Sequence, residues 1–276
     1  MSTAIGSSEH TGSVPSRKWL LADTWSSFKR WMKKNLRNPF VVFITLVQPV
    51  IWLVLFTQVF EAIAQLPGFA TESYLAFFAP AVVIQIALFA AASSGINLVF
   101  DMREGVFNKL LASPADRTAM FFGKTLAEAV VTSIQVVIVL VVALVLGATV
   151  ETGFLGALGI IAIALLFSLG FAAFSNIVAL TTQNEDATIL ITNLLALPLL
   201  FVSTAFLPEA LLPGWVQVVS AFNPVTDGVD AIRALMLDGW VWNVIGPSIV
   251  GLAVFDLLIG AIAVVLMRRA TDATPR

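Results

Sequence analysis

The sequence has no cysteine, one histidine (His10) and few charged residues in a chain of 276. Without cysteine it has no disulfide framework, no thiol nucleophile and no zinc site built on Cys ligands. Charged residues make up 12% of the chain, against about 25% in a typical soluble domain, and hydrophobic residues make up 59%. This balance predicts an integral membrane protein and gives no support to nucleic-acid binding.

Motifs that would carry catalysis are also missing. No group of His, Asp and Glu has metal-ligand spacing, and neither Ser-x-x-Lys nor Gly-x-Ser-x-Gly occurs. Gly123, Lys124 and Thr125 match the end of a nucleotide-binding P-loop, but Thr118 stands where the first glycine belongs. The chain is therefore not expected to be an enzyme, and no catalytic, cofactor-binding or metal-binding residue is predicted in it.

Long apolar runs dominate what is present. A membrane-spanning helix needs about 20 mainly apolar residues, and six runs reach that length. We therefore predict an all-α membrane protein with six transmembrane helices. Its expected spans are Pro39–Phe60, Leu75–Phe100, Ala129–Thr149, Phe154–Thr182, Thr188–Leu207 and Val244–Met267.

Positive charge is strongly asymmetric about these runs. If all six span, every one of the 15 Lys and Arg except Arg233 lies on the same side. Because basic loops resist translocation, this side is expected to be cytoplasmic. The sequence thus predicts a multi-pass protein of the cell membrane, with both termini and the connection between the second and third spans in the cytoplasm.

The segment before the first span has an amphipathic pattern. Apolar side chains recur at helical spacing on one face, and basic side chains fill the other. We expect residues 1–16 to be a disordered cytoplasmic tail, 17–38 a helix in the membrane interface, 39–267 a six-helix transmembrane domain and 268–276 a cytoplasmic tail. The helix could equally be a plain juxtamembrane anchor. The residues that define it are Trp25, Phe28, Lys29, Arg30 and Lys33.

Residues 208–243 form the only long segment predicted on the outer side. Trp215, Trp240 and Trp242 suit a membrane surface, and Val216, Val219 and Phe222 recur at near-helical spacing. Short helices that re-enter the outer leaflet would fit this pattern. Such helices could line an exit route or form a lid with structural duties only.

Four polar residues inside the predicted spans are candidates for a pathway or for contacts between helices. Asp256 lies near the middle of the sixth span, where a carboxylate normally faces the bundle interior or a water-filled cavity. Gln85, Asn97 and Gln135 fit interhelical hydrogen bonds. For Asp256, a structural role and a role in contacting a substrate both stay open.

The connection after the second span, from Phe100 to Arg117, reads FDMREGVFNKLLASPADR. Its charges, an apolar pair and a following proline predict a short amphipathic helix. On composition alone, an ordinary solvated loop explains it equally well.

This connection resembles the E-G-T-x-E-x-L-L-x-x-P-x-x-R stretch of type-2 ATP-binding-cassette (ABC-2) permeases of the daunorubicin-resistance type. Further matches lie in the first span, the fifth span and the outer segment, so the resemblance covers the chain from the interfacial helix to the tail. Val106 and Asn108 depart from the Thr and Glu common in the family, and Asp227 stands near a position where Tyr is common. The matching residues of the connection are Glu104, Gly105, Leu110, Leu111, Pro114 and Arg117, followed by Gly123 and Lys124.

The resemblance implies a permease subunit of an exporter that uses ATP hydrolysed by a separate cytoplasmic ATPase. The connection would be a coupling helix docked on that ATPase, with Leu110 and Leu111 as apolar anchors and Glu104, Lys109 and Arg117 setting orientation. ATP and Mg would be bound by the partner, and two permease copies would form a homodimer in the bilayer. The cargo would be a hydrophobic or amphipathic drug, lipid or glycan.

Two alternatives belong to other classes. One is an ATPase-independent secondary carrier that uses Asp256 as its ion or proton site. The other is a membrane anchor that binds an ATPase without transporting anything. Loss of transport in Asp256→Asn, with little effect of changes at Leu110 and Leu111, would favour the carrier.

Overall fold

The computed structural model describes residues 17–36, 39–65, 69, 71, 73–104 and 117–272, and within them it contains helices and no strand. The predicted all-α class is confirmed for this part of the chain. The long helices are α1 Arg17–Leu36, α2 Pro39–Phe60, α3 Tyr74–Arg103, α5 Arg117–Val145, α6 Gly153–Thr182, α7 Glu185–Phe201 and α10 Trp242–Asp272. The short ones are η1 Glu61–Gln65, η2 Glu209–Leu211, α8 Gly214–Ser220, α9 Pro224–Arg233 and the π-helical η3 Ala234–Asp238.

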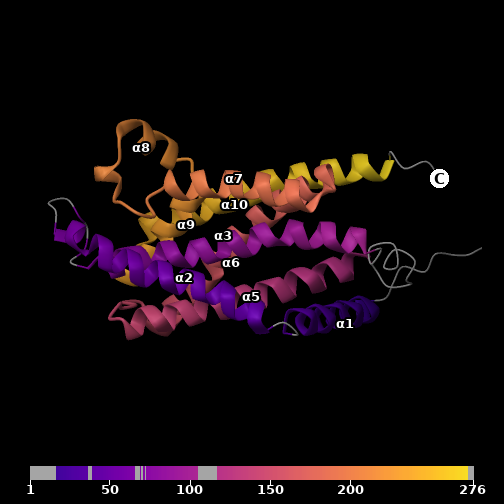
Figure 1. The fold of residues 1–276 in the computed structure, drawn as a ribbon, viewed down its shortest axis with the longest axis horizontal. Coiled ribbons are helices and arrows are strands. Elements are labelled where there is room, and N and C mark those ends of the chain that lie inside the picture. Colours follow the sequence, from indigo (N-terminus) through magenta and orange to yellow (C-terminus); the bar gives the residue numbers. More distant parts are fainter. Residues whose placement is uncertain are drawn as a thin grey trace, which may run out of the picture.

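The long helices run roughly along the longest axis of the molecule (Figure 1). We call the end that carries the C-terminus the terminal end. The opposite end, with η1, α8 and the turn between α5 and α6, is the distal end. Since α10 continues to Asp272, it includes the first residues of the predicted tail 268–276. Residues 1–16, the predicted N-terminal tail, lie outside the described part of the chain.

Five helices of the described residues are long and apolar enough to cross a membrane. The fifth predicted span, Thr188–Leu207, differs: its helix, α7, has 17 residues and ends at Phe201. At 1.5 Å per residue it reaches about 26 Å, short of a hydrocarbon core of about 30 Å. The other five spans are Ile44–Gln65, Tyr74–Arg103, Gly123–Val145, Gly153–Thr182 and Trp242–Ala263.

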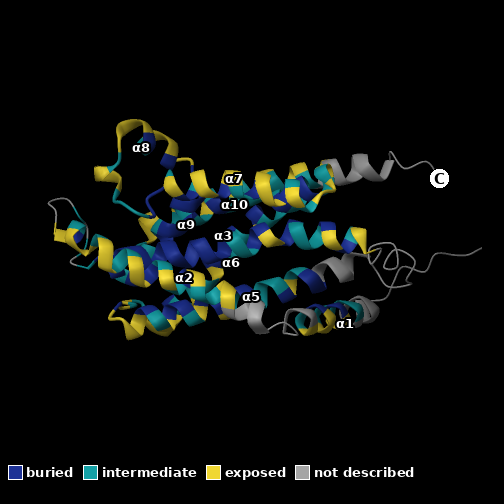
Figure 2. Ribbon diagram, viewed as in Figure 1, coloured by how far each residue is buried: buried dark blue, intermediate teal, exposed yellow. Residues whose placement is uncertain are grey.

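The helix α3 is the core of the bundle, and 83% of its apolar window is buried. Figure 2 shows the deepest burial along α3 and the elements around it. Its most extensive neighbour is α6. There, Gly95 lies so close to Ser175 that a Cβ atom would clash with the Ser175 main chain. The Ser175 hydroxyl donates to the Ala92 carbonyl (2.6 Å) and accepts from the Gly95 N–H (3.2 Å).

The helix α1 packs mainly on α5 and lies along it near the terminal end (Figure 1). Among residues 23–33, the part of α1 whose side chains are described, Ser27 and Trp31 are buried. In contrast, Trp25 of the predicted apolar stripe is 53% exposed and stacks on half-buried Phe28, with Lys29 Nζ 5.3 Å from the Trp25 ring. The bundle therefore covers a different face of α1 from the apolar stripe, whose place in a membrane interface stays a prediction.

Residues 208–243 hold the short helices α8 and α9. The helix α8 stands away from the bundle at the distal end (Figure 1), whereas α9 packs against α3, α6 and α10. In α8, Val216 is buried, but Trp215 and Val219 are exposed, as is Phe222 just after it. This segment thus has one helix inserted into the bundle and one that presents apolar side chains outward.

Candidate functional site

The predicted coupling residues fall mostly outside the described part of the chain. Gly105, Lys109, Leu110, Leu111 and Pro114 are not described, and neither are the departures at Val106 and Asn108. Glu104, which is exposed, follows α3, and α5 begins at Arg117. The structure therefore places both ends of the connection at the terminal end of the bundle (Figure 1).

An ion pair joins two helices beside that connection. Arg103, the last residue of α3, donates from Nη1 to Glu185 Oε1 of α7 across 3.4 Å. The Arg103 side chain is 53% exposed. Exposed pairs of this kind contribute little to the free energy of folding. We therefore expect this contact to influence the relative orientation of the ends of α3 and α7 and to add little stability.

A buried polar cluster links α3, α5 and α6 deeper in the bundle. We call it the Lys124 node, made of Ser94, Lys124, Glu128 and Asn176. Lys124 Nζ donates to the Ser94 carbonyl (3.2 Å) and lies 3.7 Å from Glu128 Oε1. The Ser94 hydroxyl donates to Glu128 Oε2 (3.1 Å) and accepts a longer bond from Asn176 Nδ2 (3.5 Å). A charged pair is thus held within an apolar span by bonds from neighbouring helices.

The four predicted intramembrane residues lie on α3, α5 and α10. Gln135 of α5 is buried and donates to the Thr45 hydroxyl of α2 across 3.2 Å, an interhelical bond of the predicted kind. Gln85 of α3 is buried, and its Oε1 has no hydrogen-bond partner among the described residues. Asn97 is half-buried on α3. Asp256 of α10 presses against Gly170 of α6, where a Cβ atom would clash with its carboxylate.

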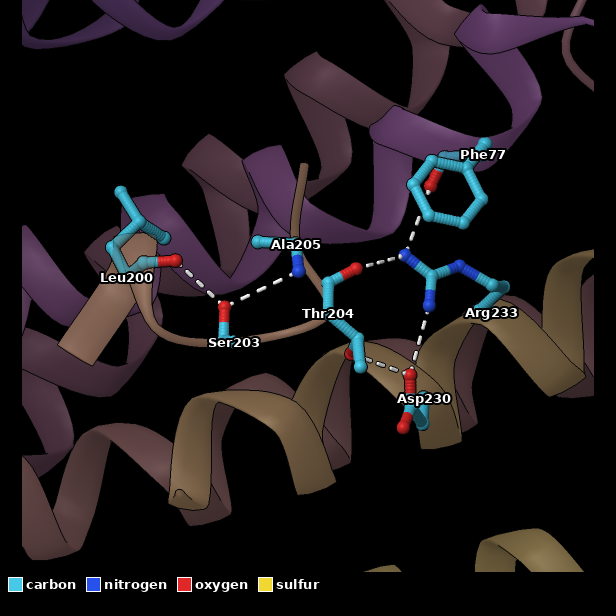
Figure 3. Close-up of polar contacts among 7 residues, drawn as sticks. All are labelled: Phe77, Leu200, Ser203, Thr204, Ala205, Asp230 and Arg233. Carbon is cyan, nitrogen blue, oxygen red and sulfur yellow. Dashed lines mark hydrogen bonds and ion pairs between the residues drawn. The ribbon is translucent and has the colours of Figure 1, made fainter. Parts of the chain in front are cut away.

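At the distal end, Arg233 of α9 fastens three elements together (Figure 3). We call Phe77, Thr204, Asp230 and Arg233 the Arg233 clasp. Arg233 Nη1 donates to Asp230 Oδ1 (2.8 Å), and Nη2 donates to the carbonyls of Thr204 (2.8 Å) and Phe77 (3.4 Å). The guanidinium also lies 3.9 Å from the centre of the Phe77 ring. The clasp thus binds α9 to α3 and to the chain that follows α7.

Hydrogen bonds of Thr204 and Ser203 complete this region. The Thr204 hydroxyl donates to Asp230 Oδ1 (2.8 Å). The neighbouring Ser203 hydroxyl donates to the Leu200 carbonyl (2.7 Å) and accepts from the Ala205 N–H (3.2 Å), as Figure 3 shows. The main-chain hydrogen bonds of α7 end here, and side chains take their place in fixing the non-helical chain that follows.

Burial changes the ionisation of the α9 side chains. It lowers the pKa of Arg233 to about 10, against the attraction of Asp230 that raises it, so Arg233 stays protonated at neutral pH. Burial, reinforced by the nearby Asp230 charge, raises the pKa of Asp227 to about 6. Asp227 lies against Gly251 of α10, where a Cβ atom would clash with its carboxylate. Asp227 is therefore a carboxyl whose pKa lies close to neutral pH, and burial raises the pKa of Asp230 on the same helix as well.

Asn223 joins the end of α7 to the start of α9. Its Nδ2 donates to the carbonyls of Leu199 and Val202, both at 2.6 Å, and its Oδ1 accepts from the Val225 N–H at 2.9 Å. Pro224 follows at the first helical position, which lacks an N–H to satisfy. One side chain thus caps two helices, and this explains why α7 stops early.

Aromatic rings pack α2 onto α3 at the same end. The Phe56 ring of α2 lies 5.3 Å from Phe78 of α3 and 5.5 Å from Phe206. The Tyr74 hydroxyl donates to the Phe206 carbonyl across 3.1 Å. The chain after α7 is therefore held by aromatic contacts as well as by the clasp.

The sequence predictions missed these clusters as sites. Arg233 was noted as the one base on the far side, and that isolation was the available signal for a buried role. Lys124 was noted as part of a false P-loop and as a match to the family, and neither observation predicted a buried polar cluster. The capping role of Asn223 was readable, because Asn before Pro is a typical start of a helix.

Comparison with known proteins gives consistent matches over most of the chain. A family model described as ABC-2 type transporter matches residues 22–237. The chain is 29% identical over 243 residues to a Cyanophora paradoxa protein named as a transport permease (ycf38), with 83% of each chain covered. It is 28% identical over 229 residues to a daunorubicin resistance ABC transporter permease protein of Streptomyces coeruleorubidus, covering 82% of this chain and 78% of the other. Nodulation protein J of Rhizobium leguminosarum bv. viciae is 30% identical over 174 residues, 62% of this chain and 66% of that protein.

Proposed function

The chain belongs to the ABC-2 type transporter family, and from this we propose that it exports a hydrophobic or amphipathic compound from the cytoplasm. It is the permease subunit, a membrane component without catalytic activity of its own, and ATP is hydrolysed by a separate ATPase subunit. The match to the family over residues 22–237 is the observation that carries this function. Relatives named for daunorubicin resistance support an apolar drug as one cargo.

In our proposal the partner ATPase binds ATP and Mg²⁺, and the permease converts its movement into transport. The connection between α3 and α5 is the docking element, with Leu110 and Leu111 in a groove of the ATPase and charged residues setting the orientation. The support is the family resemblance together with the convergence of both ends of the connection at one end of the bundle (Figure 1). The orienting residues would be Glu104, Lys109 and Arg117.

We further propose that the terminal end is cytoplasmic and that the protein lies in the plasma membrane. The bases are the support: Arg103, Arg117 and Lys124 lie toward the terminal end, and Arg233 lies in the distal clasp. In this topology α7 is a short fifth span, completed by the chain that leads to α9, and α10 is the sixth. Residues 39–267 form the membrane domain, between a cytoplasmic segment that includes α1 and a short cytoplasmic tail. Two copies form a homodimer.

Inside-out vesicles that contain the permease and its ATPase test this function. We expect ATP-dependent uptake of daunorubicin, measured by its fluorescence. Truncation of buried anchor residues at an interface costs about 2 kcal/mol or more, roughly a 30-fold loss of affinity. Leu110→Ala with Leu111→Ala should therefore abolish co-purification of the ATPase and uptake together.

Two further variants make this test specific. Asp256→Asn should retain ATP-dependent uptake, and Val250→Ala, at an exposed position of α10, serves as the control. Uptake that is independent of ATP and lost in Asp256→Asn would contradict the proposal. ATPase binding without any uptake of daunorubicin, a lipid or a glycan would also contradict it.

A further inference from the structure

Lys124 is a buried ammonium group at the start of a candidate membrane span, Gly123–Val145. The residue is 6% exposed. A charged side chain is costly to bury in apolar surroundings unless it is paired and hydrogen-bonded, so a buried Lys needs definite partners. Lys124 has contacts on two other helices, the Ser94 carbonyl on α3 and the Trp31 ring on α1, in addition to Glu128 on its own helix.

The contact with α1 is unusually close. Gly123 faces α1, and a Cβ atom at this position would clash with Ser27 and the Thr24 carbonyl. The next residue, Lys124, holds its Nζ 5.6 Å from the centre of the buried Trp31 ring, which is within the range of a cation–π interaction. The packing of α1 on α5 therefore requires a glycine at position 123 and uses the charge of Lys124.

The contact with α3 ties together the two sides of the connection at 105–116. Ser94 belongs to the helix that precedes the connection, and Lys124 and Glu128 belong to the helix that follows it. The Ser94 carbonyl and hydroxyl bond to Lys124 and Glu128 respectively. Asn176 adds α6 through the Ser94 hydroxyl. A force applied to the connection thus reaches helices whose relative positions are fixed by one polar cluster.

We propose that Lys124 is a positioning residue that makes α1, α3 and α5 move as one body when the ATPase acts on the connection. It acts through Trp31 and Ser94 and touches neither nucleotide nor cargo. This role rests on the proposed function. The chemistry it requires is a long cationic side chain, because the same group must reach a carbonyl on α3 and an aromatic face on α1.

Spin-label distances in the permease alone test whether Lys124 fixes α1 to the bundle. The chain has no cysteine, so Ser26→Cys on α1 and Thr181→Cys on α6, both at exposed positions, provide two unique labelling sites. With Lys124 present, we expect one narrow distance distribution. Lys124→Met should lose it, and Lys124→Arg, which keeps the charge and the donors, should retain it.

Trp31→Leu tests the same contact from the α1 side and leaves the Lys124–Glu128 pair intact. It should broaden the same distribution, because the aromatic face that meets Lys124 is gone. The matched control is Asn193→Leu. Among the described residues, the Asn193 side chain donates within its own helix, to the Ile189 carbonyl at 2.9 Å, so this change should leave the distribution as it is. An unchanged narrow distribution in both Lys124→Met and Trp31→Leu would overturn the proposal.

Coupling in proteoliposomes gives the functional readout. With the partner ATPase present, Lys124→Met should lower the daunorubicin transported per ATP hydrolysed by about tenfold, in the range typical of coupling between sites, while ATP hydrolysis continues. Lys124→Arg should restore the ratio. A normal ratio in Lys124→Met would also overturn the proposal. Absence of ATP-dependent transport in the unmodified protein would contradict the proposed function instead, and the spin-label distances would still decide the role of Lys124.

Discussion

Arg233 has four polar or aromatic contacts in the distal end of the bundle, and none of them is close in sequence except Asp230. Its guanidinium meets the Asp230 carboxylate, two main-chain carbonyls and the Phe77 ring. Three directional bonds on a planar fork are geometry that lysine cannot reproduce. The residue therefore determines how α9 sits on α3.

Substitution of Arg233 should destabilise the fold strongly. Arg233→Ala leaves the half-buried Asp230 carboxylate without its counter-charge, and we expect a loss of about 2 kcal/mol, less than the cost of breaking a fully buried pair. Arg233→Lys should recover part of this loss. The free energy of unfolding can be measured by SDS titration with tryptophan emission as the signal. Glu151→Gln, at an exposed site of the same end, is the control, and equal stability of Arg233→Ala and the parent protein would contradict the assignment.

Asp227 should make stability depend on pH. Its pKa of about 6 in the fold lies above the ordinary value of 3.8, so between about pH 4 and 6 the folded state binds more protons than the unfolded state. The free energy of unfolding therefore falls as pH rises through this interval. Asp227→Asn cannot ionise, so it should melt above the parent at about pH 7.5 and by a smaller margin at about pH 5. A margin that is the same at both pH values would refute the assignment.

Residue types at the distal end were predictable, but their partners were not. Arg233 bonds to the carbonyls of Phe77 and Thr204, which lie 156 and 29 positions away in the chain. No local pattern encodes such a contact. The Lys124 node has the same character, because Ser94 and Asn176 come from other helices. Spacing identifies a helix face, whereas a polar cluster depends on how several faces meet.

Among the helices, α7 and α9 depend on each other through Asn223. The amide satisfies two carbonyls at the end of α7 and one N–H at the start of α9. This shared cap accounts for the early end of α7, the helix of the predicted span Thr188–Leu207. Apolar length alone predicted a helix through Leu207. It could not reveal that the Asn223 amide, 24 positions after Leu199, would donate to the last carbonyls of α7.

Asn223→Ala should destabilise the protein by about 2 kcal/mol, since it leaves buried main-chain groups without partners. Asn223→Asp should be at least as harmful, because it keeps the acceptor for Val225 but sets an oxygen against two carbonyl oxygens. Gln217→Ala is a matched control: its amide also donates to two carbonyls, those of Glu209 and Leu212, but within one loop. If Asn223→Ala unfolds like the parent in the same SDS titration, the double cap has no energetic role.

The remaining long helices followed from composition. Solid apolar runs predicted five of them, and the ends differ by at most five residues except at the start of α5, because apolar length is a local property of the chain. The helix α5 begins at Arg117, 12 residues before the predicted Ala129, because its first turns carry polar and basic residues that an apolar run does not include. The amphipathic pattern of 17–38 predicted a helix, and α1 is one. It did not predict that α1 would pack on α5 through Ser27 and Trp31, since that contact depends on Gly123 of another helix.

For the whole molecule, the sequence pattern and the family both indicate a membrane subunit whose ATPase is a separate protein. The bundle has polar clusters at two levels, the Lys124 node toward the terminal end and the Arg233 clasp at the distal end. In the proposed topology these levels lie near the cytoplasmic and outer faces. A movement that starts at the connection would meet the node first and the clasp last, so the clasp should affect stability more than ATPase binding.

The central claim is that a separate ATPase binds the connection between α3 and α5 in the cytoplasm. A single cysteine at Ala112→Cys, next to the proposed anchors in a chain that otherwise has none, can carry a photo-crosslinker in native membranes. The account predicts that thiol reagents reach this cysteine from the cytoplasmic side only and that the cross-linked protein is an ABC ATPase. Labelling from outside the cell, or cross-linking that never recovers an ATPase, would contradict it.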